Sequence, residues 1–223
     1  MEKALLYKEW KKTRLFTLGI AIIGIILLGY ILLKLGRSFR LAGMEHLWDV
    51  IVNRKQFMFR DLKYFPIAAA LWLGMAQYFP EVIQKRIKLS LHLPLPEGKV
   101  ILLMYGYGLG ILLGVYLLQL LSLWVFSSIN FPYEFTISTF KTLAPWYIAG
   151  FITYLFVAMV CLEPVWKRRA FNGLLGIATV YLFFLSDVPS AYQPVIYLLI
   201  VTLVAVFPFG FLSVQRFKEG TQD

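Results

Sequence analysis

Long runs of apolar residues, separated by short polar segments, limit this chain to very few folds. The first run covers residues 15–33, which is 19 residues without a charged side chain. A helix needs about 20 mainly apolar residues to cross the hydrocarbon core of a bilayer. The composition agrees, because 60% of the 223 residues are hydrophobic and 15% are charged, whereas a soluble domain carries about 25% charged residues. We therefore expect an all-α integral membrane protein.

Six such runs are predicted to be membrane spans within one transmembrane domain, residues 1–223. They cover residues 15–33, 64–79, 100–126, 144–162, 170–185 and 194–214. Residues 34–63 are expected to form a long outer loop that holds a short amphipathic helix, because apolar residues recur there at helical spacing. A second outer loop is expected at residues 127–143.

The distribution of basic residues predicts the orientation. With the N-terminus inside, the inner segments carry 14 of the 22 Lys and Arg, and seven of the other eight lie in the loop 34–63. Cytoplasmic loops carry an excess of Lys and Arg, so both termini are expected in the cytoplasm. The net charge of +10 is then explained by attraction to the inner leaflet of the lipid bilayer. Nucleic-acid binding is not expected, because the basic residues flank apolar runs.

Three glycines in the third expected span share one helix face. Gly106, Gly110 and Gly114 follow each other at intervals of four residues. Small residues at this spacing allow two helices in a membrane to approach closely. We therefore predict a tight helix contact on this face.

The sequence contains no motif for bond chemistry. There is no Gly-x-x-x-x-Gly-Lys-Ser/Thr loop for ATP, and His46 and His92 stand alone without the spacing of a metal site. The single cysteine, Cys161, cannot form a disulfide within the chain. No charged side chain lies in the middle of an expected span, which argues against an ion-coupled transporter. We expect no enzymatic activity, no metal and no cofactor in this chain.

Two basic segments remain as candidate functional sites. Residues 1–14 mix apolar and basic side chains, as an interfacial helix does. Residues 80–99 connect two expected spans, and Val82, Ile83 and Ile87 fall on one side of a helix drawn through them. Lys85, Arg86 and Lys88 face elsewhere, and Pro94 and Pro96 end the helix. A surface helix held between two spans can convert a push from a partner into a tilt of those spans.

These two segments and the six expected spans resemble the type-2 ABC exporter permease family. Residues 6–14, Leu-Tyr-Lys-Glu-Trp-Lys-Lys-Thr-Arg, resemble the elbow helix of that family. Residues 81–99, which end in Leu-Pro-Leu-Pro-Glu-Gly-Lys, resemble its coupling helix and the segment that follows it. The long outer loop 34–63 departs from the family pattern, in which the larger loop comes late in the chain.

The resemblance implies a half-size permease in the bacterial inner membrane. Two copies, or one copy and a homologue, would pair around a path, and each would rest on a separate ATP-binding cassette ATPase subunit that holds ATP and Mg²⁺. It implies that the ATPase is contacted by Glu81, Lys85, Arg86 and Lys88. It implies that the elbow helix is braced by Trp10, Lys11, Lys12 and Arg14.

Alternatives stay open at this point. The length and the Leu-Pro-Leu-Pro turn are also similar to the permease of cytochrome c maturation. A non-transporting membrane scaffold or assembly factor would need no ATPase and would use the basic faces to hold its partners. For a transporter, the apolar and aromatic interior favours an amphipathic or lipid-like cargo.

Overall fold

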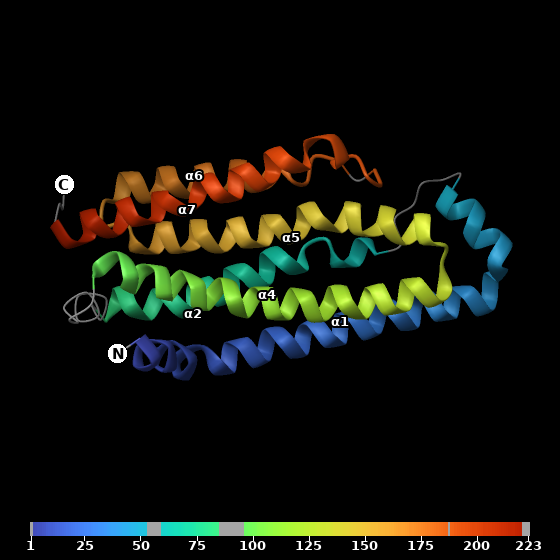
Figure 1. The fold of residues 1–223 in the computed structure, drawn as a ribbon, viewed down its shortest axis with the longest axis horizontal. Helices are drawn as coiled ribbons and strands as arrows, with labels where there is room; N and C mark the ends of the chain where they lie inside the picture. Colours follow the sequence, from blue (N-terminus) through green and yellow to red (C-terminus); the bar gives the residue numbers. More distant parts are fainter. Residues whose placement is uncertain (1, 53–58, 85–95, 187, 220–223) are drawn as a thin grey trace.

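The computed structural model describes residues 2–52, 59–84, 96–186 and 188–219, without the side chains of 39, 41–52, 97 and 210–219. All the regular structure in these residues is helical (Figure 1). The α-helices are α1 (Glu2–Val52), α2 (Phe65–Ile83), α4 (Glu97–Asn130), α5 (Tyr133–Leu162), α6 (Trp166–Leu182) and α7 (Ile196–Glu219). Two short 3-10 helices are η1 (Arg60–Leu62) and η2 (Gln193–Val195).

Three of the described helices are long and apolar enough to cross a membrane. They are the Glu2–Ser38 part of α1, the Gly98–Asn130 part of α4, and all of α5. A shorter apolar helix covers Gln193–Phe209, whereas α2 and α6 do not combine the required length and hydropathy. The chain is therefore an all-helical protein with the features of a multi-pass membrane protein.

Helix α5 is the centre of the bundle. It packs against α2, α4, α6 and α7, while α1 packs against α2 and α4 on the other side. In the most apolar stretch of α5, 72% of the residues are buried, against 22% in the corresponding stretches of α1 and α4. Figure 1 shows the helices running along one common axis, with the start of α1 and the end of α7 at the same end.

The helix expected within the segment 34–63 is present, but it is the continuation of α1 and not a separate short helix. The expected loop 127–143 is largely helical, so this part of the prediction was wrong. Helix α1 continues through Val52, and it bends along its length (Figure 1). The 127–143 segment consists of the end of α4 and the first turns of α5, separated at Phe131 and Pro132. Polar residues are part of α5 here, and the Thr142 hydroxyl is satisfied within the helix by donating to the carbonyl of Ser138 at 2.8 Å. Polarity marks where a helix leaves an apolar layer and does not mark where it ends.

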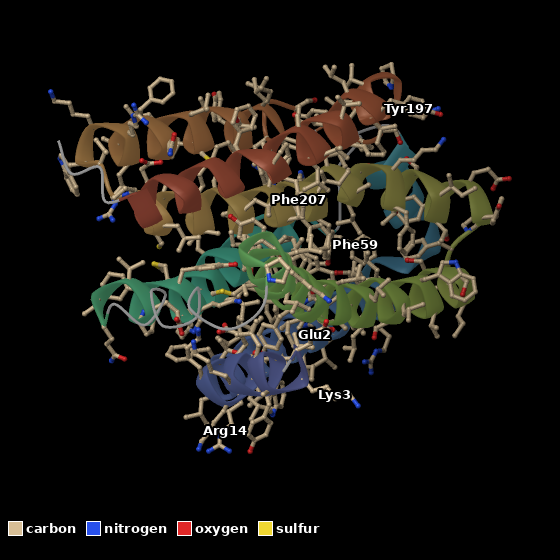
Figure 2. All side chains as sticks on the ribbon, turned by 60° about the vertical axis from the view of Figure 1, so that its left-hand side comes forward. Glu2, Lys3, Arg14, Phe59, Tyr197 and Phe207 are labelled. Atoms are coloured by element: carbon tan, nitrogen blue, oxygen red, sulfur yellow. The ribbon has the colours of Figure 1, made fainter. Side chains whose placement is uncertain are left out.

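The N-terminal segment forms a helix, as expected, but not one separated from the first span. Residues 2–14 are the first turns of α1, and no break precedes residue 15. In Figure 2, Arg14 points away from the rest of the bundle. The elbow is therefore the beginning of a single long helix, exposed on the side of Arg14 and buried on the side of Leu5, Glu9 and Thr13.

The glycine stripe is not where the helices of this chain make their closest contact. A Cβ added at Gly106, Gly110 or Gly114 would meet nothing within 4 Å. At Gly108, on another face of α4, the added Cβ would lie 2.0 Å from the hydroxyl oxygen of Tyr154. The closest helix approach within this chain is therefore at Gly108, because the Tyr154 ring reaches across from α5 and occupies the space that a side chain at Gly108 would take.

Replacing Gly108 with alanine should lower the stability of the protein. Tyr154 would have to move, at an expected cost of about 2 kcal/mol. Gly19→Ala is the matched control, since a Cβ at Gly19 of α1 meets nothing within 4 Å, and it should stabilise the helix by about 0.5–1 kcal/mol. Thermal unfolding of both variants in detergent measures the difference. Equal unfolding temperatures would contradict the close approach at Gly108.

Candidate functional site

A cluster of charged side chains joins the beginning of α1 to the end of α2. The carboxylate of Glu81 accepts from Lys8 Nζ at 3.0–3.1 Å and from Lys12 Nζ at 3.0 Å. Lys12 Nζ also lies 2.8 Å from Glu9 Oε2. Glu9 and Glu81 are both fully buried. The two segments that the sequence singled out therefore meet at this cluster.

The charge of Glu81 is maintained by its partners. Burial opposes ionisation of this carboxyl, but Lys12 and Lys8 outweigh that effect and hold its pKa below the ordinary value of 4.5. Breaking a buried ion pair leaves an uncompensated charge behind and is strongly destabilising. The cluster therefore holds the N-terminal turns of α1 on α2, just before the connection 84–96.

Two further contacts fix the same part of α1 to α4. The Thr13 hydroxyl lies 2.6 Å from the Tyr107 hydroxyl, and it donates to the Glu9 carbonyl at 2.9 Å. An ion pair also joins Glu2 to Lys99 at the start of α4. The ends of α1, α2 and α4 that border the connection are thus tied together by polar contacts. We call these contacts and the Glu81 ion pairs the basal cluster.

The structure gives the predicted ATPase-contact residues different surroundings. Glu81 is buried within the chain, so a direct contact with a partner would require its ion pairs with Lys8 and Lys12 to open. Lys85, Arg86 and Lys88 lie outside the described residues, and their predicted role stays a prediction.

The predicted elbow residues also separate into two groups. Lys12 is partly buried in the basal cluster. Trp10, Lys11 and Arg14 are exposed on α1. Among these four residues, Lys12 makes an ion pair with Glu81 within the chain.

The first polar network of the interior is centred on Gln77 of α2. Its amide nitrogen donates to the Met104 carbonyl at 3.0 Å, and its amide oxygen accepts from the Tyr154 hydroxyl at 2.7 Å. Tyr78 lies 2.9 Å from the same hydroxyl. Because Tyr154 has one proton to donate, Tyr78 supplies the proton of that second bond. This network joins α2, α4 and α5.

The second polar network is centred on Gln119 of α4. Its amide oxygen accepts from the Tyr147 hydroxyl at 3.2 Å, and its amide nitrogen donates to the Gly24 carbonyl of α1 at 3.4 Å. Nearby, the Tyr116 hydroxyl donates to the Pro66 carbonyl at 2.7 Å. Both glutamines lie within expected spans, and both have partners on neighbouring helices.

Sequence reasoning missed the tyrosines and one lysine. The tyrosines looked like ordinary apolar interior, although tyrosine hydroxyls usually find a partner when buried. Lys8 was set aside as one of several basic residues. One signal of the basal cluster was available in the sequence. Glu9 and Lys12 are three residues apart, which places a carboxylate beside a cation on one helix face. Phe207 of α7, labelled in Figure 2, packs edge-on against Tyr105 of α4, and their ring centres are 5.8 Å apart.

The arrangement of the basal cluster suits the transmission of movement between helix ends. Among residues 2–52, 59–84, 96–186 and 188–219, no three His, Cys, Asp or Glu side chains lie together so that they could hold a metal ion. The basal cluster can transmit a displacement, because it joins the beginning of α1 to the end of α2 and the beginning of α4. The latter two helix ends flank the connection 84–96.

Replacing Glu81 with glutamine should destabilise the protein by about 2 kcal/mol at neutral pH, because Lys12 loses one of its two charged partners in a buried site and keeps only Glu9. Lys8→Gln is the matched control, and it should cost less than about 1 kcal/mol because the Lys8 side chain is 36% exposed. Unfolding temperatures in detergent compare the two. A larger effect for Lys8→Gln would contradict the assignment of Lys12 as the main partner.

The same variant should change the pH dependence of stability. The folded-state pKa of Glu81 is lowered, so its stabilisation is fully present above about 4.5 and is lost as pH falls through the folded-state value. Wild type should therefore lose stability relative to Glu81→Gln below about pH 4.5. Unfolding curves of both proteins between about pH 3 and about pH 7 measure this difference in stability. Both limits lie about one and a half units or more from the ordinary pKa of about 4.5. Parallel curves would refute the ion pairs.

Tyr154→Phe should lower stability by about 1 kcal/mol, because Gln77 loses the donor of a 2.7 Å hydrogen bond. Tyr181→Phe removes a hydroxyl from an exposed tyrosine of α6 and should leave stability unchanged. Thermal unfolding of the two variants in the same detergent tests the network. Identical behaviour would show that the Gln77 network contributes nothing.

No known protein family, curated protein or solved structure matches this chain.

Proposed function

We propose that this chain is the membrane-spanning permease subunit of an ABC transporter, driven by a separate ATPase subunit. The observation that carries the proposal is the basal cluster. It holds the N-terminal turns of α1 against the end of α2, where the proposed coupling segment 80–99 begins. A displacement imposed on that segment would move α1 and α2 together, and Lys99–Glu2 would extend the movement to α4.

The proposed arrangement in the membrane has six spans and both termini in the cytoplasm. It is supported by the order of the helices, because α1 begins, α2 ends and α4 begins at one end of the bundle. The proposed ATPase would meet this end. Lys85, Arg86 and Lys88 would supply the positive face of the contact.

The proposed permease acts with a second copy or a homologue. Gly106, Gly110 and Gly114 are exposed on α4 and make no close contact within the chain. The predicted tight helix contact on this face is therefore assigned to a neighbouring subunit. The direction of transport is proposed to be export, as the family resemblance implies, with an amphipathic cargo.

The test is a pull-down of the tagged full chain in mild detergent at native expression, with identification of bound proteins and an assay of ATP hydrolysis. Wild type should bring down a P-loop ATPase in equal proportion. A variant with Lys85, Arg86 and Lys88 all changed to glutamine should lose it, because the positive face is removed.

The matched control changes Lys167 and Arg168 to glutamine. Both are exposed and basic, and they lie at the start of α6 on the proposed cytoplasmic side. The control should keep the ATPase. A wild-type preparation without an ATPase and without ATP turnover would overturn the transporter proposal and favour the scaffold.

A further inference from the structure

An apolar groove runs between α2 and α6 along the surface of α5. Its volume is about 640 Å³. One wall is the α2 stripe Ile67, Leu71, Met75 and Phe79, and the floor includes Phe156 of α5. Both walls carry exposed apolar side chains, such as Met75 at 51% and Ile177 at 70%. The groove is therefore open toward the side on which the bundle faces lipid.

The dimensions of the groove restrict its occupant. Ile67 and Phe79 are 12 residues apart on one helix, so the stripe is about 18 Å long at 1.5 Å per residue. The volume then gives a mean cross-section of about 36 Å², less than half of the roughly 80 Å² of a helix 10 Å wide. A length of 18 Å is close to half of a hydrocarbon core of roughly 30 Å. An acyl chain of one leaflet fits this space better than a helix does.

A lysine lies at one end of the groove. Lys63 lines the groove directly before α2 begins, is only 6% exposed, and holds its ammonium group among aromatic rings. Its ammonium nitrogen is 5.6 Å from the ring centres of Tyr64 and Phe184, which stack on each other at 5.9 Å. A lysine at the end of an apolar stretch of this kind places its charge at the level of lipid headgroups. Its positive charge complements a phosphate.

We propose that the groove is a binding site for one anionic phospholipid, with an acyl chain along the α2 stripe and the headgroup phosphate at Lys63. The lipid belongs to the leaflet that Lys63 faces. This assignment does not rest on the transport proposal, because a bound lipid would fill the groove in a transporter and in a scaffold alike. It gives Lys63 the role of headgroup selection and the groove walls the role of holding the chain.

Gly173 offers a way to fill the groove without disturbing the fold. It lines the groove on α6, and a Cβ added there would meet nothing within 4 Å. Gly173→Leu should therefore occupy the acyl-chain space. Gly29→Leu is the matched control, because a Cβ at Gly29 of α1 also meets nothing within 4 Å and lies away from the groove.

The experiment is native mass spectrometry of the purified full chain, titrated with phosphatidylglycerol and, separately, with phosphatidylcholine of the same acyl chains. Wild type should bind the first phosphatidylglycerol about fivefold more tightly than phosphatidylcholine, as one added charge contact would give. Lys63→Gln should remove this preference. Lys141→Gln, a basic residue of α5 outside the groove lining, should keep it.

Gly173→Leu should weaken the binding of both lipids, while Gly29→Leu should bind them as wild type does. Equal binding of the two lipids by wild type, or a preference that persists in Lys63→Gln, would overturn the role of Lys63. Unchanged binding by Gly173→Leu would overturn the groove as the site. A wild-type dimer that Gly173→Leu separates would show that a second copy fills the groove, and the lipid assignment would fall.

Discussion

Polar side chains inside the bundle have no water to bind, and the packing of the helices depends on how this constraint is met. In an apolar layer each polar group has to find its partner within the protein. Gln77 and Gln119 do so through tyrosines of α5, Tyr154 and Tyr147 respectively. One helix thus supplies the partners of both glutamines, and this is consistent with the deep burial of α5. Removing α5 would leave both networks incomplete at once.

Full charges are kept at the ends of the helices, where the same constraint is weaker. Lys8, Lys12 and Glu81 form their ion pairs at the junction of α1 and α2, beyond the expected second span 64–79. A charge in the centre of a bilayer is costly, whereas a partly buried pair near the end of a helix retains access to water. The interior is therefore held by neutral hydrogen bonds, and the end next to the connection is held by ion pairs. The two kinds of contact suit a rigid bundle with one region at which displacement can be applied.

Part of this arrangement could be predicted from the sequence. The apolar runs predicted an all-α membrane protein, and the two glutamines were recognised as the most polar interior groups. The helix expected in the segment 34–63 was found as a continuation of α1, and the expected loop 127–143 was wrong. Local polarity does not show whether a helix continues beyond the apolar layer. The tight contact predicted for the face of Gly106, Gly110 and Gly114 stays a prediction, because within this chain a Cβ at these positions meets nothing within 4 Å. A glycine stripe identifies a face that can be approached and not the helix that approaches it. Only the position of Tyr154 identified Gly108 as the close contact.

The sequence by itself determined the helical class, the separation of apolar and basic segments and the absence of charges from the middle of the spans. These properties follow from the composition of each segment and from the spacing of its apolar residues, and both can be read locally along the chain. The tertiary structure alone decided that Lys8 and Lys12 reach Glu81, some 70 residues away. It also decided that α2 and α6 leave a groove along α5. Such contacts depend on which helix faces are brought together, and residues distant in sequence carry no local signal of that choice.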